Sequence, residues 1–404
     1  MKFIANQNII HDAVISAAKA AASKTAVNAL DGVLLTLAGN KLTATGYDLE
    51  TGIRISVDVE GIEDGGVVVD HRLFAEMLRR MPAQEITVTS DGKADVAMSA
   101  GSVKLSLMGK SADNYPDIVE LNDSISLTMP QSLLKESVTQ VLYAAASKEM
   151  FSPALLGVLF EQRDGVLFVV GSDGVRVALK KLPFDKEVKQ FVVPRKTVEA
   201  LIRNLDGPRT IAEYSGDSDT AGESAAPKKS SAKSQKNKEN KSEDDDITII
   251  LDRNQISFSK KDYIIISRLL EGKYIDYQRV ISVTYPNEIV INVADFAGCM
   301  NRCSILINEK FKSPAVMTIR GKKVNISCKT MLGNISEELE IRPVNQADPD
   351  KDFVVGVNPR YIHDAITNSG CDELRMEYST AVGPIRFTPL EGDDAIFVVV
   401  PVRI

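Results

Sequence analysis

The sequence lacks most of the residues and motifs on which enzymatic sites depend. Tryptophan is absent, and the 404 residues include only three histidines, at positions 11, 71 and 363. No GxxxxGK[ST] loop, GxGxxG turn, HExxH helix or GxSxG elbow occurs. The common phosphate-binding, dinucleotide-binding, zinc-dependent and acyl-transfer sites therefore have no sequence support. We predict a protein that is not an enzyme, with no catalytic residues and no cofactor.

Cysteine is also scarce, and its spacing argues against a metal site. The four cysteines lie at positions 299, 303, 328 and 371, and no CxxC pair occurs. Cys299 and Cys303 are one helical turn apart, which would supply half of a zinc site. Zinc takes four ligands, however, and His363 is the only histidine nearby in the sequence. We interpret both cysteines as small buried residues and predict no bound metal.

Long hydrophobic runs are absent as well. No apolar stretch approaches the roughly 20 residues that a membrane-spanning helix needs. The N-terminal segment is interrupted by Asn6, Gln7 and Asn8, unlike the continuous apolar core of a signal peptide. The composition, with 44% hydrophobic and 25% charged residues, is typical of a globular protein. We expect a cytoplasmic location and no contact with a membrane.

What the sequence does contain is a repeated pair of strands. Residues 167–182, LFVVGSDGVRVALKKL, match residues 42–57, LTATGYDLETGIRISV, at an offset of 125. In each copy an apolar strand leads into a Gly-x-Asp turn, and a second, alternating strand follows. Glycine and aspartate favour tight turns, so both segments predict β-hairpins. A weaker copy at residues 324–341 keeps the two strands and a glycine but not the aspartate.

The aspartates of these turns, Asp48 and Asp173, could be interpreted as a pair of catalytic carboxylates. They occupy equivalent positions in separate copies, next to Gly46 and Gly171. Turn formation explains both residues without any chemistry. We therefore predict a structural role for them.

Two families of helical stretches repeat with nearly the same offset. Apolar residues three and four apart predict one buried stripe on each helix. One family contains Phe74, Met77, Leu78 and Met81, then Val198, Leu201, Ile202 and Leu205, and then Ile362, Ala365 and Ile366. The other contains Ile10, Val14 and Ala18, then Leu134, Val138 and Leu142, and then Phe296 and Met300. The chain is therefore predicted to hold three copies of one unit.

These copies define the predicted domains, at residues 1–125, 126–282 and 283–404. Inside the second, residues from about 208 to 246 are rich in Ser, Ala, Lys, Glu and Asp, which predicts a disordered insertion. The insertion would be either a partner-binding tail or a solvated loop. Each copy has strands, then helix, then strands, without regular βαβ alternation. We therefore predict an α+β fold with antiparallel sheets.

The charge distribution is uneven along the chain. The net charge of −7 on its own argues against binding to nucleic acid. The predicted helices and their flanks nevertheless carry more lysine and arginine than aspartate and glutamate. If the helices share a face, an acidic protein can present one basic surface to phosphate groups. Ordinary solvated helix faces are the alternative explanation.

Several segments in order along the chain resemble the bacterial DNA polymerase III beta subunit family, the replicative sliding clamps. They are TGYDLETGI, KSADNYPDI, LLGVLFE, GSDGVRVA, FVVPRKTVEALIRNLDG, SRLLEGKYIDYQRVI, SILINEKF and FVVVPVRI. The resemblance implies three copies of one α+β unit (the DNA clamp fold) per chain and a head-to-tail homodimeric ring of six units. It also implies that helices surround duplex DNA and sheets form the outside.

The function implied by the resemblance is a non-catalytic processivity factor. Such a clamp encircles DNA of any sequence and tethers the polymerase catalytic subunit, the clamp loader and other proteins with clamp-binding motifs. The chain departs from the family pattern at its insertion, at Ile275, where proline is usual, and at Val175, where histidine is typical. A clamp paralogue from a mobile element or phage, with altered partners, remains an alternative. A hydrolytic enzyme would require a nucleophile or metal cluster that the sequence does not provide.

The resemblance also assigns residues to three surfaces. The expected DNA-facing residues are Lys19, Lys24, Arg72, Arg79, Arg80, Lys135, Lys148, Arg195, Lys196, Arg203, Arg302 and Lys310. The expected dimer interface pairs Lys104, Leu105 and Leu107 with Ile305, Leu306, Glu337 and Glu338 of the partner. The expected groove for partner peptides consists of Leu155, Ser172, Gly174, Val175, Arg176, Val177, Ile275, Arg279, Val280, Val398, Val400, Pro401 and Val402.

Overall fold

The computed structural model describes residues 1–22, 27–82, 85–91, 95–118, 121, 125–148, 152–205, 246–307 and 313–404. The predicted insertion at about 208–246 lies outside the described residues except for Asp246, which begins a strand. By contacts the chain divides into two compact units. The first contains residues 1–134 and 200–268, and the second contains residues 135–199 and 269–404.

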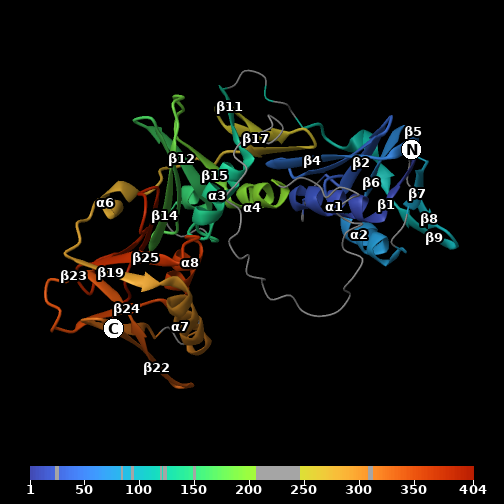
Figure 1. The fold of residues 1–404 in the computed structure, drawn as a ribbon. Coiled ribbons are helices and arrows are strands. Elements are labelled where there is room, and N and C mark those ends of the chain that lie inside the picture. Colours follow the sequence, from blue (N-terminus) through green and yellow to red (C-terminus); the bar gives the residue numbers. More distant parts are fainter. Residues whose placement is uncertain are drawn as a thin grey trace, which may run out of the picture. The chain divides into compact units, whose positions relative to one another are not determined.

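The first unit holds two antiparallel sheets (Figure 1). Its five-stranded sheet has the order β5-β1-β7-β8-β9, and its nine-stranded sheet has the order β10-β6-β2-β3-β4-β18-β17-β16-β11. The strands are β1 (Lys2–Asn6), β2 (Val33–Ala38), β3 (Lys41–Tyr47), β4 (Thr51–Asp58), β5 (Glu60–Glu63), β6 (Gly65–Val69), β7 (Glu85–Ser90), β8 (Asp95–Ala100), β9 (Val103–Met108), β10 (Lys110–Ser111), β11 (Ile125–Pro130), β16 (Asp246–Leu251), β17 (Gln255–Lys260) and β18 (Tyr263–Arg268).

The second unit also holds two antiparallel sheets. Its nine-stranded sheet has the order β15-β12-β13-β14-β27-β26-β25-β19-β23, and its four-stranded sheet has the order β22-β21-β20-β24. The strands are β12 (Gly157–Arg163), β13 (Val166–Ser172), β14 (Arg176–Pro183), β15 (Phe191–Pro194), β19 (Asn287–Asn292), β20 (Ala315–Arg320), β21 (Lys323–Thr330), β22 (Gly333–Glu340), β23 (Arg342–Asn345), β24 (Phe353–Val357), β25 (Glu373–Tyr378), β26 (Ile385–Pro389) and β27 (Ala395–Val399).

The six predicted helices are present, in three successive pairs. They are α1 (Gln7–Ala17) with α2 (His71–Arg80), α3 (Gln131–Leu142) with α4 (Arg195–Asn204), and α7 (Val293–Leu306) with α8 (Pro359–Thr367). Shorter helical turns are η1 (Ala18–Ala20), η2 (Ala112–Asn114), η3 (Pro153–Leu156) and α6 (Tyr277–Ile281). In Figure 1, α1 lies against α2 and α7 against α8. The predicted α+β fold, built from a repeated unit, is confirmed.

The start of α2 illustrates how local sequence sets these helices. The carboxylate of Asp70 accepts hydrogen bonds from the backbone amides of Arg72 and Leu73, both at 2.9 Å, and so caps the first turn. Phe74 and Leu78, one turn apart, are fully buried on the inner face. The cap and the apolar stripe together give the helix the bounds that the sequence predicts.

Gly46 and Gly171 serve a different purpose from the one predicted from the sequence. Both lie inside strands, β3 and β13, rather than in the turns that follow. A Cβ atom at Gly46 would lie 2.0 Å from the carbonyl oxygen of Ala17, and one at Gly171 would lie 2.1 Å from that of Val141. The glycines therefore allow helices α1 and α3 to pack directly on the strands.

The third copy has a different small residue at the position of these glycines. The pairing registers of hairpins β3–β4, β13–β14 and β21–β22 place Cys328 where the first two copies have Gly46 and Gly171. Cys328 is buried, as are Cys299 and Cys303 on α7. The interpretation of Cys299 and Cys303 as buried residues is confirmed, and the third copy accepts a small thiol where the others need glycine.

The close packing at Gly171 gives a stability prediction. Gly171→Ala should lower the free energy of unfolding by about 1 to 3 kcal/mol, because the new methyl group overlaps backbone that must shift. Urea unfolding followed by circular dichroism measures the change.

The matched control is Gly298→Ala in α7. Its added Cβ would meet only the movable end of Arg302, at 3.3 Å, and alanine is a better helix former than glycine. This variant should be as stable as the parent or slightly more so. Equal midpoints for parent and Gly171→Ala would show that the helix–strand contact is looser than described.

Candidate functional site

A cavity in the second unit is the strongest candidate for a binding site. Its volume is about 450 Å³, and its walls combine aliphatic side chains, one tyrosine ring and a few polar groups. The lining residues are Val175, Ile307, Ser313, Pro314, Asn358, Arg360, Tyr361, Val400, Pro401 and Val402. An apolar cavity with few polar groups suits the side chains of a peptide or a small apolar ligand.

Backbone hydrogen bonds hold the C-terminal wall of this cavity in place. Strand β27 pairs with β14, and the amide of Val400 then donates to the carbonyl of Val175 at 2.9 Å. The amide of Val402 donates to the carbonyl of Gly356 at 2.8 Å. The C-terminal segment therefore contacts both sheets of the second unit, and its side chains are fixed relative to the β13–β14 turn.

The β13–β14 turn presents Val175 to solvent. Asp173 accepts hydrogen bonds from the amides of Val175, at 3.0 Å, and Arg176, at 3.1 Å. Gly174 has a φ of +91°, a conformation that favours glycine. Ser172, fully buried, donates to the carbonyl of Arg176 at 2.7 Å. The predicted turn-forming role of Asp173 is confirmed, and Val175 is left 36% exposed at the rim of the cavity.

Arg176 lies behind the cavity wall, and its guanidinium is hydrogen-bonded to groups of the same chain. Its guanidinium donates to Asp173 at 2.9 Å, to Asp364 at 2.7 Å and to the carbonyl of Tyr143 at 2.9 Å. Burial lowers the pKa of Arg176, but the ion pairs with Asp364 and Asp173 outweigh this effect, so the pKa is raised overall. From the sequence we expected these donors to bind a peptide, whereas in the structure they bind acceptors of the same chain.

The guanidinium of Arg176 also fixes a wall of the cavity. It lies over the ring of Tyr361, 4.6 Å from the ring centroid, and over Tyr143 at 5.3 Å. Tyr361 lines the cavity. Arg176 is therefore a positioning residue, which orients Tyr361 without facing the cavity itself.

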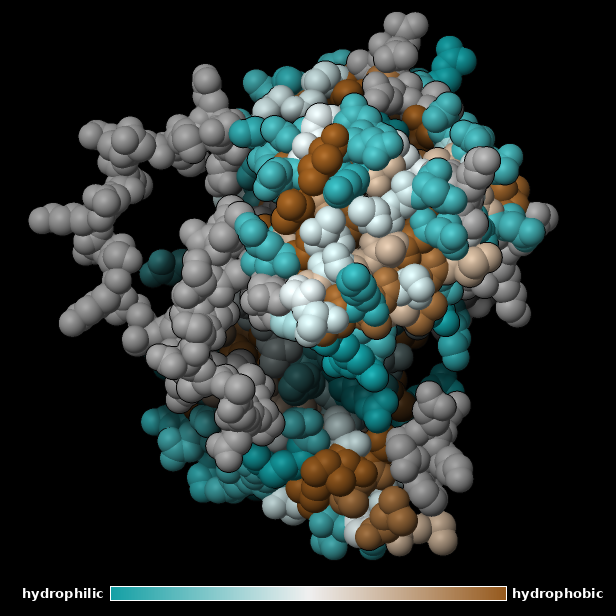
Figure 2. All heavy atoms as spheres, turned by 90° about the vertical axis from the view of Figure 1, so that its right-hand side faces the viewer, coloured by the Kyte–Doolittle hydropathy of each residue, from teal (hydrophilic) through white to brown (hydrophobic). Residues whose placement is uncertain are grey.

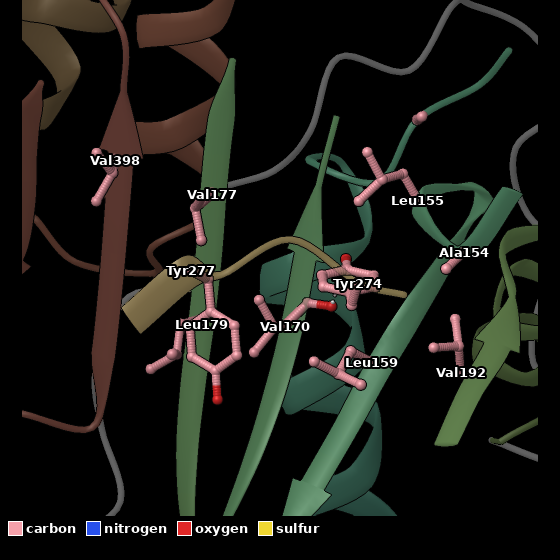
Figure 3. Close-up of a cluster of buried hydrophobic side chains, with 11 residues drawn as sticks. Ala154, Leu155, Leu159, Val170, Val177, Leu179, Val192, Tyr274, Tyr277 and Val398 are labelled. Atoms are coloured by element: carbon pink, nitrogen blue, oxygen red, sulfur yellow. Dashed lines mark hydrogen bonds between the residues drawn. The ribbon is translucent and has the colours of Figure 1, made fainter. Parts of the chain in front are cut away.

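Another part of the predicted groove forms a packed cluster (Figure 3). Leu155, Val177 and Val398 are buried there together with Tyr274 and Tyr277. The tyrosine hydroxyl of Tyr274 donates to the carbonyl of Val170 at 3.2 Å, and that of Tyr277 donates to Glu161. Burial raises the pKa of both tyrosines, so they stay neutral donors.

Ile275 and Val280 are partly buried against this cluster. Arg279, by contrast, has a side chain that is 87% exposed and pairs with Asp276 at 2.8 Å. The predicted groove residues are thus divided. Val175, Val400, Pro401 and Val402 line the cavity, while the other aliphatic residues support it from the neighbouring cluster.

Six lining residues were not predicted from the sequence, namely Ile307, Ser313, Pro314, Asn358, Arg360 and Tyr361. The last three belong together. They begin helix α8, where Asn358 caps the first turn by accepting the amide of Arg360 at 3.0 Å. The sequence locates this helix start next to Pro359 but gives no sign that it faces the C-terminal segment. Only the tertiary packing of the second unit brings them together.

The residues of the expected dimer interface lie on two sheet edges. Lys104 is exposed, Leu105 half-buried and Leu107 buried on β9, the last strand of the five-stranded sheet. Glu337 is half-buried and Glu338 exposed on β22, the last strand of the four-stranded sheet. Each of these strands pairs with a single neighbour in the described part of the chain.

An apolar patch adjoins β22. Ile305, at the end of α7, is 74% exposed, and Met331 and Leu332, in the β21–β22 turn, are 91% and 60% exposed. Leu306 reaches to 3.8 Å from the position a Cβ would take on Gly333. These exposed side chains make the end of α7 a candidate contact surface. Figure 2, which draws the face on the right-hand side of Figure 1, shows hydrophobic residues in separate groups among hydrophilic ones.

The predicted DNA-facing cations lie on or beside the helices, and they differ in how far their side chains are exposed to solvent. The exposed ones are Lys19, Arg72, Arg79, Arg80, Lys148, Lys196, Arg203 and Arg302, and the half-buried ones are Lys135 and Arg195. Lys24 and Lys310 lie outside the described residues.

Some of these cations already have partners within the chain. Arg79 and Arg80 both pair with Glu76, and their hydrogen bonds lower the pKa of that carboxylate to about 2. Arg195 donates to the carbonyl of Ala145 at 2.6 Å, and Arg302 pairs with Glu337.

The described residues include no group of three or more metal-ligating side chains in a suitable arrangement. In the same part of the chain, no helix is long and apolar enough to cross a membrane.

Comparison with known proteins gives consistent matches over the whole chain. Models of the DNA polymerase III beta subunit match at residues 1–119 (N-terminal domain), 128–213 (central domain) and 278–403 (C-terminal domain). The beta sliding clamp of Halalkalibacterium halodurans is 24% identical over 427 residues and that of Bacillus subtilis is 22% identical over 415, with 100% of each chain covered.

Solved structures of the same family share the fold. The DNA polymerase III beta subunit from Thermotoga maritima superposes with a TM-score of 0.81 at 23% identity, covering 100% of this chain and 99% of that one. The DNA polymerase sliding clamp from Bacillus subtilis gives a TM-score of 0.80 at 21% identity, with the same coverage.

The arginine network gives a prediction for the cavity wall. Arg176→Met should lower the free energy of unfolding by about 1 to 3 kcal/mol, because it leaves Asp173 and Asp364 without their shared cation. Chemical unfolding measures the loss.

Arg279→Met is the matched control, since its side chain is almost fully exposed. It should change stability by less than about 0.5 kcal/mol. Equal effects of the two substitutions would contradict the positioning role of Arg176.

Proposed function

Because the chain belongs to the DNA polymerase III beta subunit family, we propose that it acts as a sliding clamp. It is a non-catalytic ring that encircles duplex DNA and tethers the replicative polymerase, the clamp loader and other DNA-processing proteins. It acts in the cytoplasm as a homodimer of three-domain chains, with domain boundaries near residues 125 and 282. The full-length match to curated clamps favours this function over that of a paralogue with altered partners.

One observation of the structure carries the proposal, namely the size of the sheets. Two sheets have nine strands, whereas the other two have five and four and end in β9 and β22. Pairing of β9 with β22 of the next copy joins the smaller sheets into a third nine-stranded sheet. Such a head-to-tail contact between two copies closes a ring and removes both open edges.

The chemistry of the two edges is complementary. Lys104 on β9 is basic, and Glu337, Glu338 and Glu340 on β22 are acidic. Glu337 and Glu338 also pair with Arg302 and Lys323 of their own chain. The exposed apolar residue Ile305 beside β22 gains an apolar neighbour when the seam closes. Opposite charges direct the pairing, and the apolar contact holds it.

The proposed ring places the helices around DNA. Phosphate contacts by lysine and arginine bind duplexes of any sequence, which allows sliding. Exposed cations such as Lys148 and Arg72 suit this task better than Arg195 and Arg302, whose guanidinium groups bind acceptors of the same chain.

The apolar cavity is the proposed site for partner peptides that contain glutamine and leucine. Burial of one leucine-sized side chain contributes roughly 1.5 to 3 kcal/mol. One or two such anchors give exchangeable, micromolar binding, which suits a clamp that serves several partners in turn.

The seam gives the first functional prediction. Ile305→Asp should convert the dimer into monomers, because it places a charge in the apolar part of the interface. Sedimentation velocity measures the oligomeric state. Ile62→Asp, on the outer strand β5 where the isoleucine is 50% exposed, is the control and should remain dimeric. A dimeric Ile305→Asp protein would place the seam elsewhere.

The proposed DNA-binding surface gives the second functional prediction. Lys148→Ala and Arg72→Ala should each weaken binding equally for all sequences and reduce the slope of log affinity against log salt by about one unit. Fluorescence anisotropy of a short, labelled linear duplex, from which the protein dissociates freely, provides the affinities. Lys189→Ala, in a loop between strands, should leave the slope unchanged, and a slope unaffected by all three variants would remove these helices from the DNA surface.

A further inference from the structure

The cavity carries a positive charge that the proposed binding of apolar anchors does not use. Among the described residues that line it, Arg360 alone has a charged side chain, and this side chain is exposed. Within the described residues its guanidinium makes no ion pair or hydrogen bond, whereas its backbone amide is held by Asn358. Arg360 is therefore available to a ligand in the cavity.

Two carboxylates of the same unit, those of Asp173 and Asp364, do not pair with Arg360. Both are bound to Arg176 behind the wall. The other polar lining groups, Ser313 and Asn358, are uncharged. The described lining residues consequently offer one cation and no carboxylate next to apolar walls.

We propose that Arg360 is a specificity residue that selects partner peptides with an aspartate or glutamate beside the apolar residue that enters the cavity. This inference rests on the proposed function of the cavity as a peptide site. The apolar walls formed by Tyr361, Val400 and Val402 bind the anchor, and the guanidinium binds the carboxylate. Arginine holds carboxylates by charge-assisted hydrogen bonds, which are stronger than neutral ones.

Paired fluorescent peptides test the proposal on the full-length dimer. The two peptides share a Gln- and Leu-containing sequence and differ by one Glu→Gln change beside the leucine. The parent protein should bind the acidic peptide about three- to tenfold more tightly. Arg360→Gln should bind both peptides equally, and Arg360→Glu should prefer a third peptide with lysine at the variable position.

Two further variants separate the possible failures. Arg253→Gln, in the exposed turn between β16 and β17, should keep the full preference. Val400→Asp, which charges the cavity wall, should abolish binding of every peptide. Equal affinities of the parent for the acidic and amide peptides, or a preference that survives in Arg360→Gln, would overturn the role of Arg360 alone. Failure of the parent to bind any of the peptides would overturn the peptide site itself and this inference with it.

Discussion

The proposed ring depends on the unpaired backbone groups of two edge strands. Strand β9 ends the five-stranded sheet and β22 ends the four-stranded sheet, so each exposes a row of amide and carbonyl groups. Open edges bind other strands without control unless something covers them. Within the chain, strands of successive repeats already join into two nine-stranded sheets. The proposed ring applies the same pairing between chains, and the helix pairs carried by these sheets then supply the basic lining.

The proposed peptide site depends on the same repeat architecture. The β13–β14 turn, the start of α8 and the C-terminal segment meet because β27 pairs with β14 in one sheet. Arg176 then holds this arrangement by linking Asp173, Asp364 and the ring of Tyr361. Rigid walls reduce the entropy cost of binding a short peptide. In this proposal Arg176, whose guanidinium is hydrogen-bonded within the chain, positions the wall, and Arg360 at the rim selects the peptide.

The sequence alone predicted the repeat, the α+β class and the helix pairs, because hydrophobic periodicity and turn residues are local signals. The reason for Gly171 was not local, since only the packed structure brings the carbonyl of Val141 to it. From the sequence we expected Arg176 to have free donors for a peptide, and the sequence could not show that Asp364, 188 residues away, binds the guanidinium. Arg360 gave no signal, as a charged residue in a helix start is ordinary until the C-terminal segment is placed beside it.

The central claim is that the chain forms a closed ring around DNA, and topology tests it most directly. The protein is loaded by a clamp loader onto a nicked circular plasmid, washed at high salt and followed by gel filtration before and after a single restriction cut. A ring should stay on the circle through the wash and leave once the DNA is linear, because enclosure does not depend on phosphate contacts. Equal retention on circular and linear DNA, or loss from both at high salt, would contradict the account.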